Sequence, residues 1–520
     1  FRKPVNELTL SESALLAGLI PAPSRYNPRN DPVAAENKRM IVLDKMLEQD
    51  RIDPVAHAEA AQQVVWLASQ GPPPGPATVV YPPETQQSSQ PYFTDYVRRW
   101  LISHLPGGED QIYQDGLRIE TTLDPDLQAS AERRVGDFLD GRAPDLRTSL
   151  VSVEPPTGYV RAFVSGRDFA NDNVNYALGS RSAGGVGGAG SGRQPGSAFK
   201  PFVLAQALDT GIPPTAKYSG GPHDVSEACG ADNPVLGNYG GARFGTLDLR
   251  TATEKSVNTV YTRLILDVGV EASVGLANRV GLTSVTYKPG VDCASVALGV
   301  KETSPLDMAS AYGVFAARGL RAEPTPVLRV TDRDGNVIID NTTPTTERVL
   351  KETVADNLND ILQGVLVSGT AAGRGLDRTA AGKTGTTNDN VDAWFVGYTP
   401  TLSTAVWMGY ENKSERKELG NITGGSHPAR IWQAFMREAL ADVPVTEFTE
   451  PAPIVAIADA AKLQQRKGFG PGAAQRPRSV EVPNYVEPLP EPFVDDPTVN
   501  TLPQDTKTTT TEFDTPPLFN

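Results

Sequence analysis

The spacing of apolar residues predicts helices over residues 1–70. A capping box at residues 9–12 precedes an apolar run at 14–20, which reads as the first helix. Prolines at positions 32 and 54 each follow an aspartate, a pairing typical of an N-cap residue and the first helical position. These patterns predict a small helical region that carries no chemistry of its own.

A connecting region follows. The proline-rich stretch at residues 71–83 predicts an extended connector. Beyond it, the pattern predicts a helix at 92–104, a strand at 117–122 and a second helix that begins at the Asp124-Pro125 turn. We expect this helix, strand and helix to link larger domains.

Strand patterns in the second part of the chain predict one sheet. Short strands at 150–153 and 159–164 are separated by turn residues and predict a hairpin, and three more antiparallel strands are predicted at 380–387, 393–398 and 404–410. The segment between these two groups is mostly helical by pattern. We therefore expect an α/β fold with a five-stranded antiparallel sheet flanked by helices, plus an all-helical subdomain.

Composition limits the possible functions. The chain has 520 residues, 39% of them hydrophobic, and a formal net charge of -14, which argues against a nucleic-acid partner. No apolar run reaches the length of about 18 residues that spans a bilayer. Because the first residue is Phe1, we expect a membrane anchor to be missing upstream. After residue 443, Pro, Thr and acidic residues predict a disordered tail.

Metal and cofactor sites are not predicted. The four histidines are scattered, and Cys229 and Cys293 are isolated from other ligand types. These cysteines either close one loop or remain two buried thiols, and both alternatives stay open. A G-x-G-x-x-G pattern within residues 182–190 follows no strand and lacks an acidic partner, so we expect a mobile loop there and no dinucleotide.

The candidate chemistry lies where a Pro-Gly turn passes into a helix. Ser197 and Lys200 are three residues apart, which would place a hydroxyl beside an amine on one helical face. An amine can take the proton of the hydroxyl only when it is neutral, a state that burial or a nearby cation favours. The spacing alone is weak evidence, since Ser414 and Lys417 repeat it in a charged stretch that reads as a solvated loop.

Three motifs in order make the assignment specific. Ser197-x-x-Lys200 is followed by Ser256-x-Asn258 and then by K-T-G-T at residues 383–386, and this set resembles the penicillin-binding proteins and serine β-lactamases. Residues 193–202, 258–260 and 392–400 resemble the transpeptidase domain of the class A penicillin-binding proteins. Residues 12–19 and 22–28 resemble the end of their glycosyltransferase domain.

The resemblance implies a domain order and a fold. Residues 1–70 would be a remnant of the glycosyltransferase domain, 71–149 a linker region, 150–442 the transpeptidase domain and 443–520 the tail. The implied fold is that of penicillin-binding proteins and serine β-lactamases. The glycosyltransferase glutamates lie upstream in the family, so glycan polymerisation is not expected.

The resemblance also implies roles for individual residues. Ser197 would be the nucleophile, Lys200 its base, and Ser256 the group that passes a proton to the leaving amine. The backbone N–H groups of Ser197 and Thr386 would form the oxyanion hole. The implied substrate-binding residues are Asn258, Lys383, Thr384, Gly385 and Thr386. We expect Trp394, Trp407 and Tyr398 to pack within the sheet.

The implied function is D,D-transpeptidation in the bacterial cell envelope, outside the cytoplasm. Peptidoglycan stem peptides would be the substrates, β-lactam antibiotics would acylate the serine, and cell-wall assembly proteins are possible partners. No cofactor and no metal are implied, and membrane attachment would come only through the missing anchor. A carboxypeptidase or β-lactamase-like hydrolase is one alternative, and a penicillin-binding sensor or scaffold without enzymatic activity is another.

Overall fold

The structure is a computed structural model of the chain. It describes residues 1–454, apart from positions 24, 30, 82–87, 170–171, 180–191, 231–234 and 388. The predicted mobile loop at 182–190 and the tail from residue 455 onward therefore lie outside the described residues. No helix in these described ranges is long and apolar enough to cross a bilayer.

Three helices at the N-terminal end begin where the sequence predicts. They are α1 (Leu10–Leu19), α2 (Pro32–Glu48) and α3 (Pro54–Ala61). The capping box is present, since Thr9 Oγ1 accepts from the Glu12 backbone N–H at 3.2 Å and Glu12 Oε2 accepts from the Thr9 backbone at 2.8 Å. The region also contains a strand that the sequence did not predict. Strand β1 (Val64–Leu67) pairs in parallel with β2 (Ala77–Val80). Part of the expected connector is thus a strand.

The region expected to be a linker supplies a strand to a three-stranded sheet and a helix that packs on the main sheet. It contains α4 (Pro91–His104), α5 (Gly108–Gln114), β3 (Arg118–Thr121) and α6 (Pro125–Leu139). Strand β3 pairs antiparallel with β9 (Val327–Thr331), which in turn pairs with β10 (Val337–Asp340). Helix α6 packs on strands of the main sheet. This region is therefore joined to the body of the molecule by pairing and packing.

The main sheet has five antiparallel strands, as the sequence predicts. Their order is β12 (Ala381–Thr386), β13 (Asp392–Tyr398), β14 (Ser403–Tyr410), β4 (Leu146–Val153) and β5 (Val160–Ser165). The predicted hairpin forms one side of this sheet, and β12, which carries the K-T-G-T motif, forms the opposite edge.

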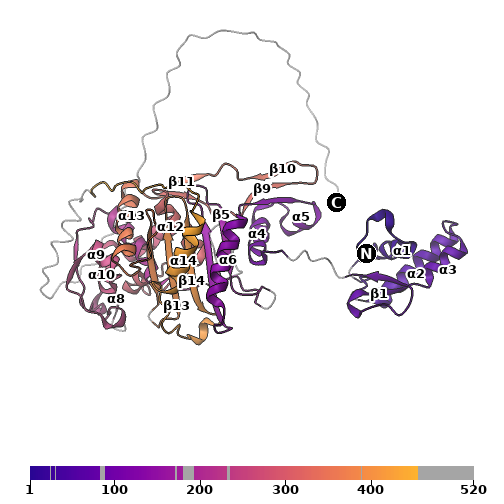
Figure 1. Cartoon of the computed structure of the whole chain (residues 1–520), viewed down its shortest axis with the longest axis horizontal. Coiled ribbons are helices and arrows are strands. Elements are labelled where there is room, and N and C mark those ends of the chain that lie inside the picture. The colour runs from indigo at the N-terminus through magenta and orange to yellow at the C-terminus, as the bar shows by residue number, and fades with distance from the viewer. Residues whose placement is uncertain are drawn as a thin grey trace, which may run out of the picture. The chain divides into compact units, whose positions relative to one another are not determined.

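Helices cover both faces of this sheet. Ser403 donates to the backbone oxygen of Ala309 in α12 (Pro305–Ala316) at 2.7 Å, whereas Thr404 donates to Met436 of α14 (His427–Ala439) at 3.2 Å. Because successive side chains of a strand point to opposite faces, α12 and α14 lie on opposite sides. Figure 1 shows α6 beside α14 over the sheet, and these two helices pack together.

The aromatic residues of the sheet are core residues, as predicted. Trp394, Trp407 and Tyr398 are all fully buried. Their polar groups have partners, since Trp394 Nε1 donates to the Gln194 backbone at 2.8 Å and the Tyr398 hydroxyl donates to Asn359 at 2.8 Å. Buried Tyr and Trp need such partners.

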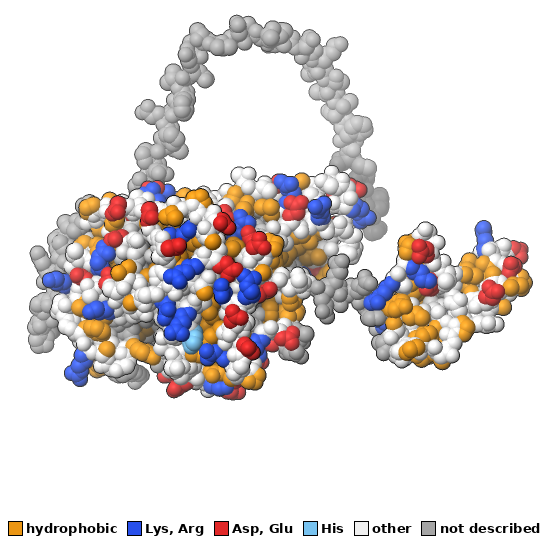
Figure 2. Space-filling view, in the orientation of Figure 1, with side chains coloured by type: hydrophobic (Ala, Val, Ile, Leu, Met, Phe, Trp, Pro, Cys, Tyr) orange, Lys and Arg blue, Asp and Glu red, His pale blue; other side chains and the backbone are white. Residues whose placement is uncertain are grey.

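The surface in view in Figure 2 intersperses acidic and basic side chains.

The helical part of the molecule lies between β5 and β12 in the sequence. Its helices are α7 (Lys200–Asp209), α8 (Ser226–Cys229), α9 (Leu249–Glu254), α10 (Asn258–Val268), α11 (Val270–Arg279) and α13 (Glu352–Val367). Its short strands are β6 (Lys217–Ser219), β7 (Thr246–Asp248), β8 (Leu320–Ala322) and β11 (Thr346–Arg348). The 3-10 turns are η1 (Val5–Glu7), η2 (Ala68–Gln70), η4 (Gly196–Phe199), η5 (Tyr239–Gly241), η6 (Ala294–Leu298) and η7 (Lys413–Glu415).

The described residues continue past residue 443, where the sequence pattern placed the start of a disordered tail. The Phe448 ring lies 5.7 Å from the ring of Tyr398, edge to face. Asn357 donates to the backbone oxygen of Ala452 at 2.7 Å. An aromatic ring and a few backbone acceptors anchor residues 443–454, although the composition of this segment is that of a tail.

Candidate active site

The predicted nucleophile lies in the 3-10 turn η4, which runs directly into α7. Pro201 occupies the first turn of that helix, where its missing N–H costs no hydrogen bond. The backbone of this turn packs closely on β12. A Cβ on Gly385 would lie 2.2 Å from the Pro195 carbonyl oxygen, and a Cβ on Gly196 would lie 2.8 Å from the Thr386 oxygen. Both glycines are thus needed for the turn to reach the strand.

Lys200 points into a shell of oxygen atoms. Its Nζ lies 2.6 Å from the backbone oxygen of Ser256, 2.7 Å from Asn258 Oδ1 and 3.2 Å from Ser256 Oγ. The Lys200 side chain is fully buried, and its Nζ lies 5.4 Å from the centre of the Tyr261 ring. The second motif is therefore in direct contact with the first.

Lys383 reaches the same serine from the edge strand β12. Its Nζ donates to Ser256 Oγ at 2.8 Å and to the backbone oxygen of Thr384 at 3.1 Å. The three motifs thus converge on one hydroxyl, that of Ser256. Residues that are 183 positions apart in sequence, from 200 to 383, share this oxygen.

The pKa values of both lysines are lowered, which favours their neutral forms. Burial, together with the charge of Lys383, holds the pKa of Lys200 well below its usual range. Burial lowers the pKa of Lys383 to about 7. A neutral amine at Lys200 has the property that a base for a serine hydroxyl requires.

Ser256 is held in an uncommon backbone conformation. Its φ angle is 55°, in the left-handed region that favours glycine. The serine directly follows the C-cap residue of α9: its N–H donates to Thr253 O at 3.0 Å and the Val257 N–H donates to Ala252 O at 2.9 Å. This is a Schellman ending, in which glycine is usual at the position of Ser256. A serine at this position accepts backbone strain that glycine would avoid, which indicates that its hydroxyl has a function.

A cavity of about 310 Å³ opens beside these groups. Its lining includes Ser197, Ser256, Asn258, Thr384 and Thr386 from the three predicted motifs. The Ser197 hydroxyl forms no hydrogen bond within the described part of the chain, so it is available to a ligand in the cavity. None of the described residues that line this cavity is Asp or Glu.

The sequence pattern missed several residues of the cavity wall. Thr370 contacts Thr384 through their hydroxyls at 2.7 Å, and the Thr386 hydroxyl accepts from the Gly424 N–H at 3.1 Å. The wall residues not predicted are Asn238, Tyr239, Ala242, Phe244, Lys255, Val257, Leu298, Thr370, Thr423 and Gly425. Lys255 and Val257 flank the predicted Ser256, whereas the others come from segments far apart in the sequence that no local signal groups.

Asn238 holds one wall segment on the helix that carries Asn258. Its Oδ1 accepts from the Thr259 N–H at 3.1 Å, and its Nδ2 donates to the oxygens of Gly220 and Ala242, both at 3.0 Å. The N-cap residue of α10, Val257, has no side-chain acceptor of its own. Asn238 therefore caps α10 from a distant loop and helps to fix Asn258.

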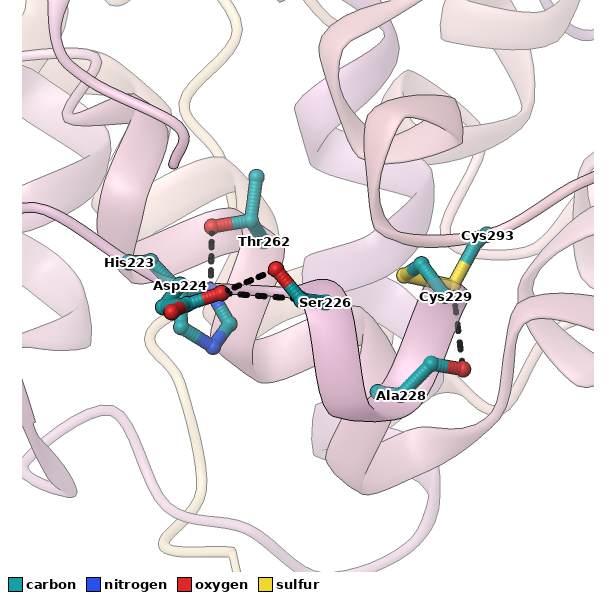
Figure 3. Close-up of a disulfide and its surroundings, with 7 residues drawn as sticks. All are labelled: His223, Asp224, Ser226, Ala228, Cys229, Thr262 and Cys293. Atoms are coloured by element: carbon teal, nitrogen blue, oxygen red, sulfur yellow. Dashed lines mark hydrogen bonds between the residues drawn. A yellow bond between two sulfur atoms is a disulfide. The ribbon is translucent and has the colours of Figure 1, made fainter. Parts of the chain in front are cut away.

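The two cysteines form a disulfide, which decides between the alternatives that the sequence left open. Cys229 ends the short helix α8, and Cys293 immediately precedes η6, with a Cα–Cα distance of 5.6 Å (Figure 3). The Gly196 N–H next to Ser197 donates to Gly299 O, just after η6, at 3.3 Å. The disulfide thus joins α8 to the start of η6, and the residue that follows η6 contacts the turn that holds Ser197.

Comparison with known proteins agrees with this geometry. Residues 148–437 match the sequence profile of the family described as penicillin binding protein transpeptidase domain, and residues 1–47 match that of the transglycosylase family. The chain therefore belongs to the penicillin-binding protein transpeptidase family, and within it to class A. The motifs, the sheet and the family profile coincide over the same part of the chain.

Several curated relatives are named penicillin-binding protein 1A. The protein of Mycobacterium tuberculosis is 34% identical over 484 residues, which cover 87% of this chain and 54% of that protein. The protein of Aquifex aeolicus is 30% identical over 536 residues, covering 87% of this chain and 69% of that protein. The chain thus spans about half the length of the mycobacterial relative.

Solved structures share the fold. The penicillin-binding protein PonA1 from Mycobacterium tuberculosis matches with a TM-score of 0.62 and 30% identity, over 74% of this chain and 98% of that one. The same mycobacterial protein in complex with penicillin V matches with a TM-score of 0.61 and 32% identity, over 70% and 96% of the two chains.

Proposed function

We propose that this chain is a peptidoglycan D,D-transpeptidase that works through an acyl-enzyme on Ser197. The observation that carries the proposal is the convergence of Lys200 and Lys383 on the Ser256 hydroxyl, beside a cavity that Ser197 lines. Membership in the transpeptidase family supports the reaction class. The substrate would be a stem peptide that ends in D-alanyl-D-alanine.

The contacts of Lys200 suggest how it acts as the base. A neutral amine has two N–H groups and one lone pair. The two closest acceptors, Ser256 O at 2.6 Å and Asn258 Oδ1 at 2.7 Å, would take the two N–H groups. The lone pair then remains to take the hydroxyl proton of Ser197 as its Oγ attacks the substrate carbonyl carbon.

The first half-reaction forms an ester and breaks an amide bond. The tetrahedral oxyanion would accept hydrogen bonds from the N–H groups of Ser197 and Thr386, each type of donor being worth roughly 3 kcal/mol. Ser256, which contacts both lysines, would pass the proton to the leaving nitrogen. D-Alanine departs, and the rest of the stem stays on Ser197 as an ester.

Binding of the substrate would use the edge strand. The terminal carboxylate would lie near Lys383, Thr384 and Thr386, where charge-assisted hydrogen bonds both hold and orient it. Asn258 would bind the substrate amide with its Nδ2, which makes only a 3.4 Å contact to Gly237 O. Gly385 would serve by keeping the strand close to Ser197.

The second half-reaction distinguishes transfer from hydrolysis. In transfer, an amine of a neighbouring stem attacks the ester carbon, loses a proton and regenerates the Ser197 hydroxyl. Hydrolysis by the route of the class A β-lactamases needs a carboxylate that activates water. No described residue lining the cavity is acidic, which favours transfer over that route. A D,D-carboxypeptidase, in which Lys200 would serve as the base, is separated from a transpeptidase by the measurements below.

The rest of the chain fits a role in the cell envelope. We assign residues 1–70 to the end of a glycosyltransferase domain, 71–149 to a linker region, 150–442 to the transpeptidase domain and the remainder to a tail. Glycan polymerisation is not proposed for this chain. The site of action would be outside the cytoplasm, with stem peptides and β-lactams as ligands.

Labelling with a fluorescent penicillin tests the proposal. Ser197→Ala should abolish covalent labelling, whereas Ser414→Ala, which removes the other serine with a lysine three residues on, should label like the parent protein. The adduct should map by mass spectrometry to the peptide that contains Ser197. Persistent labelling of the Ser197→Ala protein would overturn the assignment.

Two further measurements separate the alternatives. With excess penicillin, one equivalent bound indicates a transpeptidase-like site, and steady release of penicilloate indicates a hydrolase. Cross-linking of a polymeric stem-peptide donor then distinguishes the enzyme from a penicillin-binding sensor. A protein that labels normally and never cross-links would be the sensor.

A further inference from the structure

The cavity differs in charge from the protein that surrounds it. The chain carries a formal net charge of -14, yet no described residue lining the cavity is acidic. Lys255 is the one lysine or arginine among those lining residues, and its side chain is exposed. An anionic ligand is repelled by the molecule as a whole and meets a local positive charge at this rim.

Lys255 lines the cavity, and its neighbour in the chain pairs with the wall that contains the proposed carboxylate site. It immediately precedes Ser256, and its own N–H donates to Thr251 O at 3.0 Å at the end of α9. The preceding residue, Glu254, accepts from the Thr370 N–H at 3.0 Å through its backbone oxygen. The Thr370 hydroxyl contacts that of Thr384 at 2.7 Å. Backbone pairing therefore sets Lys255 beside the wall of Thr370 and Thr384.

The ammonium group of Lys255 is available to a ligand. Within the described residues it forms no ion pair. The adjacent acid, Glu254, lies 3.4 Å from the Ser368 hydroxyl through its Oε2. By contrast, Lys301 pairs with Asp292 at 2.6 Å and Lys351 pairs with Asp209 at 2.9 Å.

We propose that Lys255 is a substrate-contacting residue that attracts and pairs with the terminal carboxylate of the acyl donor, whether a D-alanyl-D-alanine peptide or a penicillin. This inference rests on the proposed function. Lys255 is the first charge that the carboxylate meets, and Thr384 and Thr386 then hold it for attack by Ser197.

The buried lysine of the K-T-G-T motif leaves a task for such a residue. Burial lowers the pKa of Lys383 to about 7, so its charge is only partly present at neutral pH. Lys383 also donates to Ser256 Oγ at 2.8 Å, so one of its N–H groups is not free for the carboxylate. A solvent-exposed ammonium at the rim acts before Lys383 is reached and extends the positive field into solvent.

The test measures the second-order rate constant of acylation by a carboxylate-bearing penicillin at several salt concentrations. As salt rises, this constant should fall toward that of Lys255→Gln, because the attraction by Lys255 is screened as the Debye length shortens from about 30 Å at 0.01 M to about 3 Å at 1 M. Lys255→Gln should lower it about three- to fivefold at low salt and flatten the salt dependence. Lys255→Arg should restore both, and Lys255→Glu should reverse the slope.

Lys217→Gln is the matched control, since Lys217 on β6 is also exposed and lies outside the cavity lining. The maximal acylation rate at saturating penicillin should be unchanged in Lys255→Gln, because the lysine acts on binding. A second readout uses thioester donors that end in a carboxylate or in a carboxamide. Only the carboxylate donor should discriminate between the parent protein and Lys255→Gln.

Two outcomes would overturn the proposal. One is a rate constant for Lys255→Gln within twofold of the parent, with the same salt slope as Lys217→Gln. The other is a fall in melting temperature of Lys255→Gln without any change in salt slope, which would assign Lys255 to the C-terminus of α9 alone. Failure of the function proposed above is distinguishable, because the parent protein itself would then not be acylated at Ser197.

Discussion

Lys383 donates a 2.8 Å hydrogen bond to the hydroxyl oxygen of Ser256. The same oxygen lies 3.2 Å from the Nζ of Lys200, so two buried amines share one hydroxyl. Two ammonium ions this close repel each other in a buried site, so the state in which only one of the two amines is protonated is favoured. The proposed active form has Lys200 neutral and Lys383 charged.

This relationship predicts a bell-shaped pH profile for acylation. The second-order rate constant should rise on the acidic side as Lys200 loses its proton, and fall above about pH 7 as Lys383 loses the charge that binds the carboxylate. Lys383→Arg should be slower overall but should keep its rate at alkaline pH, because arginine stays protonated. Stopped-flow labelling from pH 5 to 10 measures both limbs. An alkaline fall that persists in the arginine variant would assign that limb to another group.

The conformation of Ser256 predicts a trade between stability and activity. Ser256→Gly and Ser256→Ala both remove the hydroxyl, so both should slow acylation by about 10²-fold or more. They differ only by a Cβ at a φ of 55°, so the glycine variant should be more stable than the alanine variant by about 1 kcal/mol. Chemical denaturation compares the two directly. Equal stabilities would mean that the helix ending carries no strain at this residue.

The close approach of Gly385 to the turn before Ser197 predicts a sharp effect of one methyl group. A Cβ there would lie 2.2 Å from Pro195 O and 3.1 Å from the Cβ of Ala198. Gly385→Ala should lower the free energy of unfolding by about 1–3 kcal/mol and should strongly reduce penicillin labelling, since β12 must move away from Ser197. Chemical denaturation and fluorescent-penicillin labelling of the same preparation measure the two effects.

Gly136→Ala is the matched control for this substitution. Gly136 lies on α6, and apart from its chain neighbours and the nearby backbone of its own helix no heavy atom lies within 4 Å of its added Cβ. That variant should be up to about 1 kcal/mol more stable, because alanine favours the helix, and should label normally. If Gly385→Ala labelled at the parental rate, close packing of strand and turn would not be required for acylation.

The order of the motifs and the sheet could be predicted from the sequence because each depends on local pattern. The strands near residues 150–164 and 380–410 are short runs rich in apolar, β-branched and aromatic residues, and their turns use residues with strong turn preferences. The rim of the cavity could not be predicted in this way. Asn238 caps α10 across 21 positions, and Lys255 reads as an ordinary helix-end lysine until Thr370 is placed beside it. Such contacts depend on tertiary packing between distant segments, which a local sequence pattern does not reveal.

The cysteine pairing shows the same limit. Two cysteines in a chain are compatible with a loop closure or with two thiols, and only the Cα–Cα distance of 5.6 Å decides. The start of the tail is a similar case. Its composition predicts disorder from residue 443, whereas the Phe448 ring packs on Tyr398 and Asn357 donates to the backbone oxygen of Ala452.

The disulfide predicts that reduction lowers the stability of the protein more than it slows acylation. Cys229 and Cys293 are 64 residues apart, a loop whose closure is worth about 4 kcal/mol in the chain-entropy account. Replacing both with serine should lower the free energy of unfolding by about that amount. Acylation should slow less than tenfold, because Lys200 and Lys383 keep their contacts with Ser256. Reductant should reproduce both effects in the parent protein and change nothing in the double variant. A larger loss of labelling than of stability would mean that the disulfide shapes the cavity wall, through the link from η6 to the turn that holds Ser197.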